Sequence, residues 1–486
     1  FSGMARALVS VCLIILAVSF CANATTSRSK AKLTTIPGLT FQPNFDQYAG
    51  YITLEGTTKN IFYWFFTSQG NPSTDPVILW LQGGPGCSSV GDGLFLEHGP
   101  YYPDPIFSNK TVDIKSNFNS WNQVANIIYI ESPCGVGFSY GTNIPSDYET
   151  NDNITAVDNY IFLQGFFDIY NEFSTNEFWV TGESYGGVYI PTLAYQILTN
   201  GSDSQLAANL KKGGLMLGNP VTNCQGQEYN GEGNVLSLDN QLNLYYWHGM
   251  ASRNDYDEWN SKGCNTATPH SLLECYIIYS RVQSSIGHLD QPLQSKTAER
   301  QERRIQPNGS INPDMLYFSY CTGNGTLNFD VDIVPDCFDL DSQVSTYLND
   351  PAVQQAINAV PTKWTECTSK LAYRKLNMPI TNYLEQFFEI APEMRIMYYS
   401  GDVDLATVPF AETQRCLATM NRPVTKHWRP WVINKEVVGY VEEYDTYTYA
   451  TIKGAGHEAP QFQPAAAYLL FTTFLANGTL PGAGIQ

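Results

Sequence analysis

Short apolar segments alternate with longer polar and amphipathic stretches along most of the chain. Two of them, 48–55 and 61–68, alternate apolar and polar residues around the turn-prone 56–60, which predicts an antiparallel hairpin. Further runs are almost continuously apolar, and each ends in a loop containing Gly, Ser or Pro: 76–81, 125–130, 177–181, 214–218 and 395–399. Such runs are typical of strands buried on both faces, as in the parallel part of an α/β sheet. We therefore expect functional loops at the carboxyl ends of these strands.

The stretch from about Cys224 to Cys337 has a different pattern. Its apolar runs are sparse, and it contains polar helical stretches, several cysteines and the charged run 296–304. We interpret it as an insertion and not as a linker. A charged run is most often a solvated helix face or an exposed loop. A loop processed by proteolysis is the alternative, because nicking concentrates at exposed polar tips.

The first 24 residues resemble a targeting segment. Arg6 precedes the apolar stretch 7–20, and the small residues of 22–24 form a cleavage site, so we predict a secretory signal peptide removed after Ala24. A transmembrane anchor is disfavoured because a bilayer requires about 20 apolar residues. The sequence therefore predicts the secretory pathway, with a lysosomal or vacuolar and an extracellular destination both open, and no membrane span.

Cysteines and glycosylation motifs fit that route. Of the 11 cysteines, Cys12 and Cys21 lie in the predicted signal, and disulfides between the others would persist in an oxidising compartment. The odd remainder predicts at least one unpaired thiol. No Cys-x-x-Cys or His-Glu-x-x-His pattern occurs, so we expect no metal. The candidate N-glycosylation positions are Asn109, Asn153, Asn200, Asn308, Asn324 and Asn477.

Composition limits the class of protein. The 486 residues are 43% apolar and carry 27 basic against 46 acidic side chains, a formal charge of −19. This apolar content predicts a folded chain. The acidic balance opposes binding to nucleic acids, which depends on Lys and Arg. The length allows about three domains, or one large α/β domain with insertions.

A candidate nucleophile lies in Gly182-Glu183-Ser184-Tyr185-Gly186. The segment follows the apolar run 177–181 and precedes a helix-like pattern at 188–198. Gly-x-Ser-x-Gly in this context is typical of a strained strand-to-helix turn that exposes a serine hydroxyl. We therefore predict that Ser184 is a catalytic nucleophile.

The base and the acid should follow the serine in the order acid, then histidine. Among six histidines, His457 alone follows a β-rich run, 447–452, and stands in a glycine-containing turn. A histidine that only packs its loop is the alternative. For the acid, Asp402 and Asp404 both follow the run 395–399, and we favour Asp404, with Asp402 shaping the turn. The alternative is that both carboxylates only cap that turn.

An oxyanion hole requires backbone N–H groups near the nucleophile. Tyr185, directly after Ser184, supplies one, and the glycine-rich segment 82–89 is the evident source of another. A phosphate-binding loop is disfavoured because the segment lacks a Gly-Lys-Ser/Thr ending.

Several segments in order resemble the serine carboxypeptidases: 80–89, 97–100, 120–122, 133–140, 182–187, 401–404 and 454–457. The resemblance implies an α/β-hydrolase fold with a mixed, mostly parallel central sheet and an inserted, mainly helical cap. The implied division is a core in 33–222 and 339–486, with the cap in 223–338. The implied activity is removal of C-terminal amino acids from peptides and proteins, without a cofactor. A homodimer stays open.

The same resemblance implies roles for the site residues. It supports Ser184, Asp404 and His457 as a catalytic triad. It adds the N–H groups of Gly84 and Tyr185 as the oxyanion hole. The residues implied to bind the substrate carboxylate are Gln82, Gly83, Glu97 and Glu183.

A protonated carboxyl group can donate a hydrogen bond to a carboxylate, so we expect activity to favour acidic pH. A role of Glu183 as a helix-start acid is the alternative.

Two departures from the family pattern affect these expectations. Gln82 replaces a usual Asn, and Cys134 replaces a common Ala. The family pattern pairs Cys87 with Cys367, Cys264 with Cys275 and Cys321 with Cys337, leaving Cys134, Cys224 and Cys416 unassigned. Gln82 keeps open an acyltransferase on the same scaffold. A protective binding partner of other lysosomal proteins is the non-enzymatic alternative.

Overall fold

The computed structural model describes residues 25–104, 112–224, 235–285, 288–289, 310–311, 314–316, 340–405 and 407–482. Several predictions fall outside these ranges: the signal peptide 1–24, the charged run 296–304, Cys321, Cys337, Asn109, Asn308 and Asn324. The other candidate glycosylation positions, Asn153, Asn200 and Asn477, are exposed.

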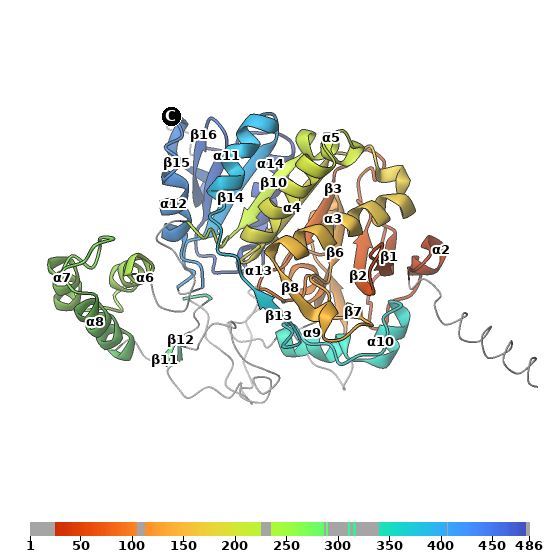
Figure 1. Cartoon of the computed structure of the whole chain (residues 1–486), viewed down its shortest axis with the longest axis horizontal. Helices are drawn as coiled ribbons and strands as arrows, with labels where there is room; N and C mark the ends of the chain where they lie inside the picture. The colour runs from red at the N-terminus through yellow and green to blue at the C-terminus, as the bar shows by residue number, and fades with distance from the viewer. Residues whose placement is uncertain are drawn as a thin grey trace, which may run out of the picture.

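An 11-stranded sheet crosses the molecule in the order β1-β2-β6-β3-β9-β10-β14-β17-β16-β15, with β7 paired to β2 (Figure 1). Its strands are β1 (Gln47–Thr53), β2 (Lys59–Phe66), β3 (Val77–Leu81), β6 (Asn126–Ile130), β7 (Tyr140–Gly141), β9 (Phe178–Glu183), β10 (Gly214–Gly218), β14 (Arg395–Gly401), β15 (Val424–Ile433), β16 (Glu436–Tyr444) and β17 (Thr448–Ile452). The strands from β6 to β17 pair in parallel, while antiparallel hairpins close both edges.

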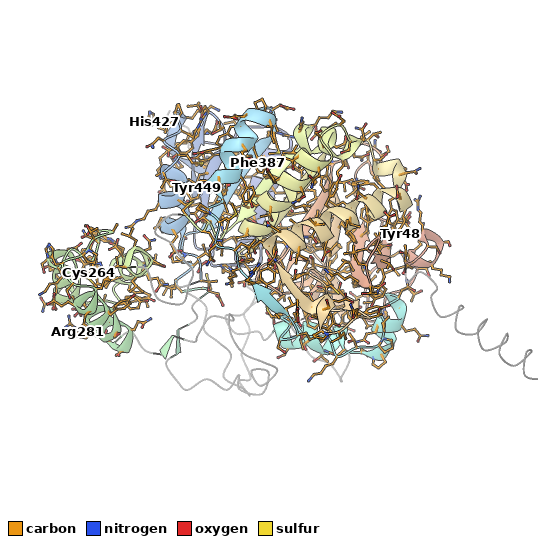
Figure 2. The ribbon with its side chains drawn as sticks, viewed as in Figure 1. Tyr48, Cys264, Arg281, Phe387, His427 and Tyr449 are labelled. Carbon is orange, nitrogen blue, oxygen red and sulfur yellow. A yellow bond between two sulfur atoms is a disulfide. The ribbon has the colours of Figure 1, made fainter. Side chains whose placement is uncertain are left out.

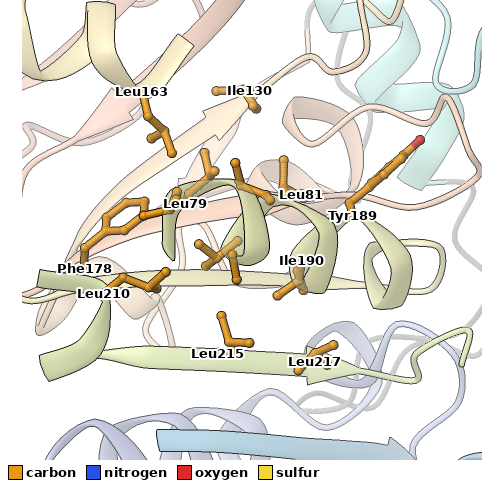
Figure 3. Packing of buried hydrophobic residues seen from close by; sticks show 14 of the residues in the cluster. Leu79, Leu81, Ile130, Leu163, Phe178, Tyr189, Ile190, Leu210, Leu215 and Leu217 are labelled. Carbon is orange, nitrogen blue, oxygen red and sulfur yellow. The ribbon is translucent and has the colours of Figure 1, made fainter. Parts of the chain in front are cut away.

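The parallel strands are apolar on both faces because each face is covered. In β3, Leu79 and Leu81 belong to one hydrophobic cluster, while Ile78 and Trp80 belong to the other. Figure 3 shows the first cluster, with Leu79 and Leu81 near Ile190 of the covering helix. Burial of both faces explains the nearly continuous apolar runs of these strands. The hairpin strands β1 and β2 are also buried on both faces, so the alternation predicted for them does not correspond to one buried and one exposed face.

Helices cover the two faces in separate layers. The first cluster is covered by α3 (Asp152–Ile169), α4 (Gly186–Asn200), α5 (Gln205–Lys212) and α11 (Thr381–Ile390). The second is covered by η1 (Val90–Glu97), α9 (Leu340–Leu348), α10 (Pro351–Ala356), α13 (Ala459–Phe462) and α14 (Pro464–Leu475). The remaining short elements are α2 (Arg28–Ala31), β4 (Tyr101–Pro103), β5 (Ile114–Ser116), η2 (Trp121–Gln123), η3 (Ser146–Tyr148), β8 (Glu149–Asn151), η4 (Asn171–Phe173), β11 (His288–Leu289), β12 (Ser310–Ile311), β13 (Ala372–Arg374) and α12 (Phe410–Ala418).

Three helices lie between β10 and α9 in the chain and form a group beside α12: α6 (Val235–Trp247), α7 (Arg253–Ser261) and α8 (Leu272–Ser285) (Figure 1). They have a hydrophobic cluster of their own, which includes Trp259 and also Leu405 of the sheet domain. A disulfide joins Cys264 to Cys275 within the group, and Figure 2 shows Cys264 there, apart from the sheet. These three helices therefore pack against the loop that follows β14.

The predicted fold class is confirmed: the protein is α/β, with a mixed, mostly parallel sheet between helical layers. The predicted hairpin corresponds to β1 and β2, and the apolar runs correspond to β3, β6, β9, β10 and β14. The hairpin of β15 and β16 was not predicted, because its residues are mostly exposed or half-buried and lack a strong apolar pattern. Within the part of the chain that the structure describes, no helix combines the length and apolar character that a membrane crossing requires.

Candidate active site

Ser184 stands at a sharp turn between β9 and α4. Its φ is 60°, in the left-handed region that is costly for a residue with a side chain. The turn is held in place because Ser184 N donates to Gly218 O at 3.0 Å, and Val221 N donates to Ser184 O at 2.8 Å. The flanking glycines are required by space: a Cβ on Gly182 would lie 2.1 Å from Leu81 O. These contacts give the Gly-x-Ser-x-Gly pattern a physical reason at this position.

The structure brings His457 and Asp404 into contact. The imidazole Nδ1 of His457 lies 2.7 Å from Asp404 Oδ2. Asp404 is fully buried and also accepts hydrogen bonds from Asn219 Nδ2 and the backbone N–H groups of Thr407 and Val408, each at 3.0 Å. These donors stabilise the ionised carboxylate, which fixes the ring of His457. Asp402 Oδ1 instead accepts from Gly454 N at 2.7 Å and shapes the turn.

Parallel pairing explains why residues so distant in sequence meet. Gly218 of β10 is in register with Glu183 of β9, and Gly401 of β14 is in register with Ile452 of β17. The carboxyl ends of these strands therefore lie along one edge, where Ser184, Asp404 and His457 follow. His427 on β15, another histidine that follows Ser184 in the chain, is instead exposed at an outer edge of the molecule (Figure 2).

The glycine-rich loop after β3 approaches the serine turn closely. A Cβ added to Gly83 would lie 2.5 Å from Tyr185 N and 2.6 Å from Ser184 Cβ, so only glycine fits there. The loop is joined to a distant segment by the disulfide between Cys87 and Cys367. The contact places Gly83 beside the N–H of Tyr185, and Gly84 follows Gly83 directly in the same loop.

A group of buried carboxyl groups lies beside the serine. Gln82 Nε2 donates to Glu183 Oε1 at 3.1 Å, while Trp80 Nε1 donates to Gln82 Oε1 at 2.8 Å. Burial raises the pKa of Glu97 to about 7, against the opposing effect of a hydrogen bond with Glu183. Burial, followed by the charge of Glu97, holds the pKa of Glu183 well above its ordinary value. Glu97 and Glu183 therefore favour a shared proton.

The pKa of His457 depends on the acidic residues around it. Burial lowers the pKa of His457, but the charge and hydrogen bond of Asp404, together with Glu458 and Asp314, outweigh it and raise the pKa to about 9. The pKa of Glu458 is itself held well above its ordinary value by burial and then by Asp314. Proton uptake by Glu458 removes part of the attraction on the imidazole, so these groups titrate as a coupled set.

Three residues of the site were not predicted from the sequence. Asn219 donates to Asp404, and Asn219 Oδ1 accepts from Gly401 N at 3.0 Å. Asn219 could have been found from the sequence, since it directly follows the apolar run 214–218. Glu458 could have been found from its place after His457. Asp314, whose backbone O accepts from His457 N at 2.7 Å, lies in the insertion and carries no recognisable pattern.

The cysteines form three disulfides within the described residues. The pairs Cys87–Cys367 and Cys264–Cys275 are those that the family pattern implied. The third joins Cys224 to Cys416, two residues left unassigned by sequence, and Cys134 is buried and free. No group of three or more metal-ligating side chains is present in the described part of the chain.

A parallel sheet between helical layers, with a serine turn after one strand and an Asp–His pair after two others, defines the α/β-hydrolase class. A family model described as "Serine carboxypeptidase" matches residues 37–477. The chain therefore belongs to the serine carboxypeptidase family, whose members are serine-type hydrolases acting as carboxypeptidases.

Two curated relatives agree with that assignment, and a solved structure agrees with the fold. "Serine carboxypeptidase-like 25" of Arabidopsis thaliana is 33% identical, covering 93% of this chain and 92% of its own. "Lysosomal protective protein" of Mus musculus is 32% identical, covering 96% and 98%. The structure of the Kex1 prohormone-processing carboxypeptidase of Saccharomyces cerevisiae aligns with a TM-score of 0.67 at 21% identity, over 93% of this chain and 97% of that chain, and supports the fold.

Proposed function

We propose that this protein removes single amino acids from the C-termini of peptides and proteins through an acyl-enzyme intermediate, and does so best at acidic pH. The observation that supports the proposal is a buried and electrostatically coupled pair of carboxyl groups, Glu97 and Glu183, of which Glu183 directly precedes Ser184. An endopeptidase has no need of proton-donating carboxyl groups next to its nucleophile.

The chemistry follows from the roles of the side chains. Ser184 Oγ attacks the last peptide carbonyl while His457 accepts the hydroxyl proton, and Asp404 stabilises the imidazolium that forms. The N–H groups of Gly84 and Tyr185 stabilise the oxyanion. His457 then donates its proton to the leaving amine, and a water molecule hydrolyses the acyl-enzyme by the reverse sequence of proton transfers.

The substrate carboxylate provides the specificity for chain ends. Protonated Glu183 donates a hydrogen bond to it, with Glu97 sharing the proton, and Gln82 and Gly83 N–H complete the site. As pH rises through about 7, Glu97 loses its proton and a carboxylate in the substrate is repelled. At acidic pH the protonated carboxyl groups also reduce the negative charge around His457, so the imidazole releases its proton more readily.

The test uses a blocked dipeptide and its C-terminal amide. Release of the last amino acid from the dipeptide should peak below neutral pH and vanish in Ser184→Ala, while the exposed Ser29→Ala variant retains full activity. The amide lacks the carboxylate, so its cleavage should peak at higher pH. Absence of serine-dependent release at every pH, or identical profiles for both substrates, would reject the proposal.

An acyltransferase is the second candidate, and Gln82 favours it. Both ends of the Gln82 amide are occupied by Trp80 and Glu183, which leaves less of it for a substrate carboxylate. In the same assay an ester acyl donor and an alcohol acceptor are supplied, and products of hydrolysis and transfer are compared. Transfer exceeding hydrolysis, with no amino-acid release from the dipeptide, would favour this function. If the protein only binds and protects lysosomal partners, neither the hydrolysis product nor the transfer product should form.

We also propose that the chain passes through the secretory pathway, with residues 1–24 removed, residues 223–338 serving as a cap, and a lysosomal, vacuolar or extracellular destination. Support comes from the disulfides and from a relative named for the lysosome. Mass loss on treatment with an N-glycosidase, mapped to Asn153, Asn200 or Asn477, would be expected; protein lacking any glycan after expression in a eukaryotic host would contradict the glycoprotein expectation.

A further inference from the structure

The side chain of Tyr185 is held at its far end by a buried acid. Tyr185 is 1% exposed, and its hydroxyl donates to Asp152 Oδ1 at 2.9 Å. Asp152 is also buried and accepts from the Tyr373 hydroxyl at 2.7 Å and from Leu376 N at 2.7 Å. Lys375 Nζ lies 5.0 Å from the centre of the Tyr185 ring. The ring of the residue after the nucleophile is therefore fixed on several sides.

The carboxylate of Asp152 does not cap the helix that Asp152 begins. It is the first residue of α3, but the N-cap is Asn151, whose side chain accepts from Ile154 N at 3.0 Å. The Asp152 carboxylate accepts from Tyr185, Tyr373 and Leu376, all outside α3. Burial and the charge of Asp152 hold the pKa of Tyr185 and that of Tyr373 well above the ordinary value, so both remain donors.

Asp152 and the glycine-rich loop after β3 both contact the segment 366–376. At one end, Thr368 N donates to Gly86 O at 2.9 Å and Ser88 N donates to Glu366 O at 2.8 Å, next to the disulfide between Cys87 and Cys367. At the other end, Tyr373 of β13 pairs with Thr150 of β8, just before Asp152. We call residues 366–376 the strap. It connects the loop that carries Gly84 to the acid that holds Tyr185.

We propose that Asp152 is a positioning residue of the oxyanion hole, acting through the Tyr185 side chain, and that the strap fixes the spacing between the Gly84 and Tyr185 N–H groups. The inference rests on the proposed function, because it requires an oxyanion at these two donors. Ser184 holds a left-handed φ of 60° that the chain would otherwise relax. Anchoring the neighbouring ring opposes that relaxation, which would turn the Tyr185 N–H away from the reacting carbonyl.

The test compares Tyr185→Phe and Tyr373→Phe with Tyr170→Phe. The first two each remove one hydroxyl donor from Asp152 and keep the ring. The control, Tyr170→Phe, removes one buried hydroxyl, which pairs with the hydroxyl of Tyr63 at 2.9 Å in the same hydrophobic cluster as Tyr185. Rates are measured per active site, counted with a fluorophosphonate. Complete loss of an oxyanion donor costs about 10²–10³-fold in kcat, and we expect about tenfold for a misaligned one, with KM little changed.

A second readout separates positioning from a merely structural effect. A peptide aldehyde forms a hemiacetal oxyanion with the serine, whereas the free C-terminal amino acid product does not. Tyr185→Phe and Tyr373→Phe should raise the aldehyde inhibition constant about tenfold and leave product inhibition unchanged. Asp152→Asn should raise the aldehyde inhibition constant more than either, because its amide N–H₂ would face a hydrogen-bond donor where the carboxylate accepted one. Tyr170→Phe should change neither constant.

The outcomes distinguish this inference from the proposed function. Wild-type kcat and aldehyde affinity in Tyr185→Phe would overturn the positioning role while leaving the carboxypeptidase proposal intact. Equal losses of aldehyde and product affinity would also overturn it, since they would indicate general damage to the site. A wild-type protein with no Ser184-dependent aldehyde binding would refute the proposed function, and the positioning role with it.

Discussion

Replacing Glu97 by Gln should change how stability depends on pH. Burial raises the pKa of Glu97 from 4.5 to about 7, so the folded protein binds this proton more tightly than the unfolded chain. The resulting stabilisation is fully present below pH 4.5 and is lost as pH rises to about 7. Such a rise corresponds to about 3 kcal/mol. Gln has nearly the same shape and cannot ionise, so the variant should lack this loss.

The assay is urea-induced unfolding of wild-type and Glu97→Gln protein at pH 4.5, 5.5, 6.5 and 7.5. The variant should be within about 1 kcal/mol of the wild type at pH 4.5, since one neutral hydrogen bond is exchanged for another, and more stable by up to about 3 kcal/mol at pH 7.5. The exposed Glu389→Gln on α11 is the control and should follow the wild type. A difference between Glu97→Gln and wild type that is the same at every pH would refute the reasoning.

Catalysis by the same variant should shift in the same sense. In the proposed mechanism Glu97 ionises as pH rises through about 7, and its charge then repels the substrate carboxylate. Gln cannot ionise, and burial still favours the protonated form of Glu183, so the alkaline limb of kcat/KM for peptides should move to higher pH. A limb that stays in place while stability flattens would separate Glu97 from carboxylate binding.

Three further substitutions test the site directly. Asp404→Asn should lower kcat by about 10⁴-fold with little change in folding, because the imidazole loses its orienting anion; stopped-flow assays with an ester substrate measure this, and a loss below tenfold would argue against the triad. Asn219→Ala removes one donor to Asp404 and should lower kcat by about 10- to 100-fold, as expected for a hydrogen bond to a charged group; unchanged kcat would show that the backbone donors suffice. Gly83→Ala places a Cβ 2.5 Å from Tyr185 N and should abolish both peptide hydrolysis and fluorophosphonate labelling of Ser184 in a protein that still unfolds cooperatively; normal labelling would contradict this packing.

The central strands and the core of the site were readable from the sequence because their signals are local. Continuous apolar runs marked β3, β6, β9, β10 and β14 to within a few residues. Ser184 was recognisable because the serine turn needs glycines on both sides, and the structure places backbone atoms where their Cβ atoms would be. Asp404 followed one of these runs, and His457 followed the β-rich run that forms β17.

Other features depended on which segments meet in space. No pattern in the sequence connects Cys224 to Cys416, which are 192 residues apart. Likewise, nothing near Asp152 indicates that its carboxylate holds the tyrosine after the nucleophile. The sequence favoured Asp404 but did not exclude Asp402, because both follow the same apolar run. Only the contact of Asp404 with His457 Nδ1 distinguishes them.

The sequence by itself determined the layers, the family and the residues with local signatures, since apolar periodicity and steric demands act over a few neighbouring residues. Only the tertiary structure decided the electrostatics. The pKa of Glu97 is raised because Glu97 is buried, and that of Glu183 because Glu183 is buried beside Glu97 and Glu458. Desolvation and charge–charge distance are set by the parallel alignment of strand ends distant in the chain, which no single segment encodes.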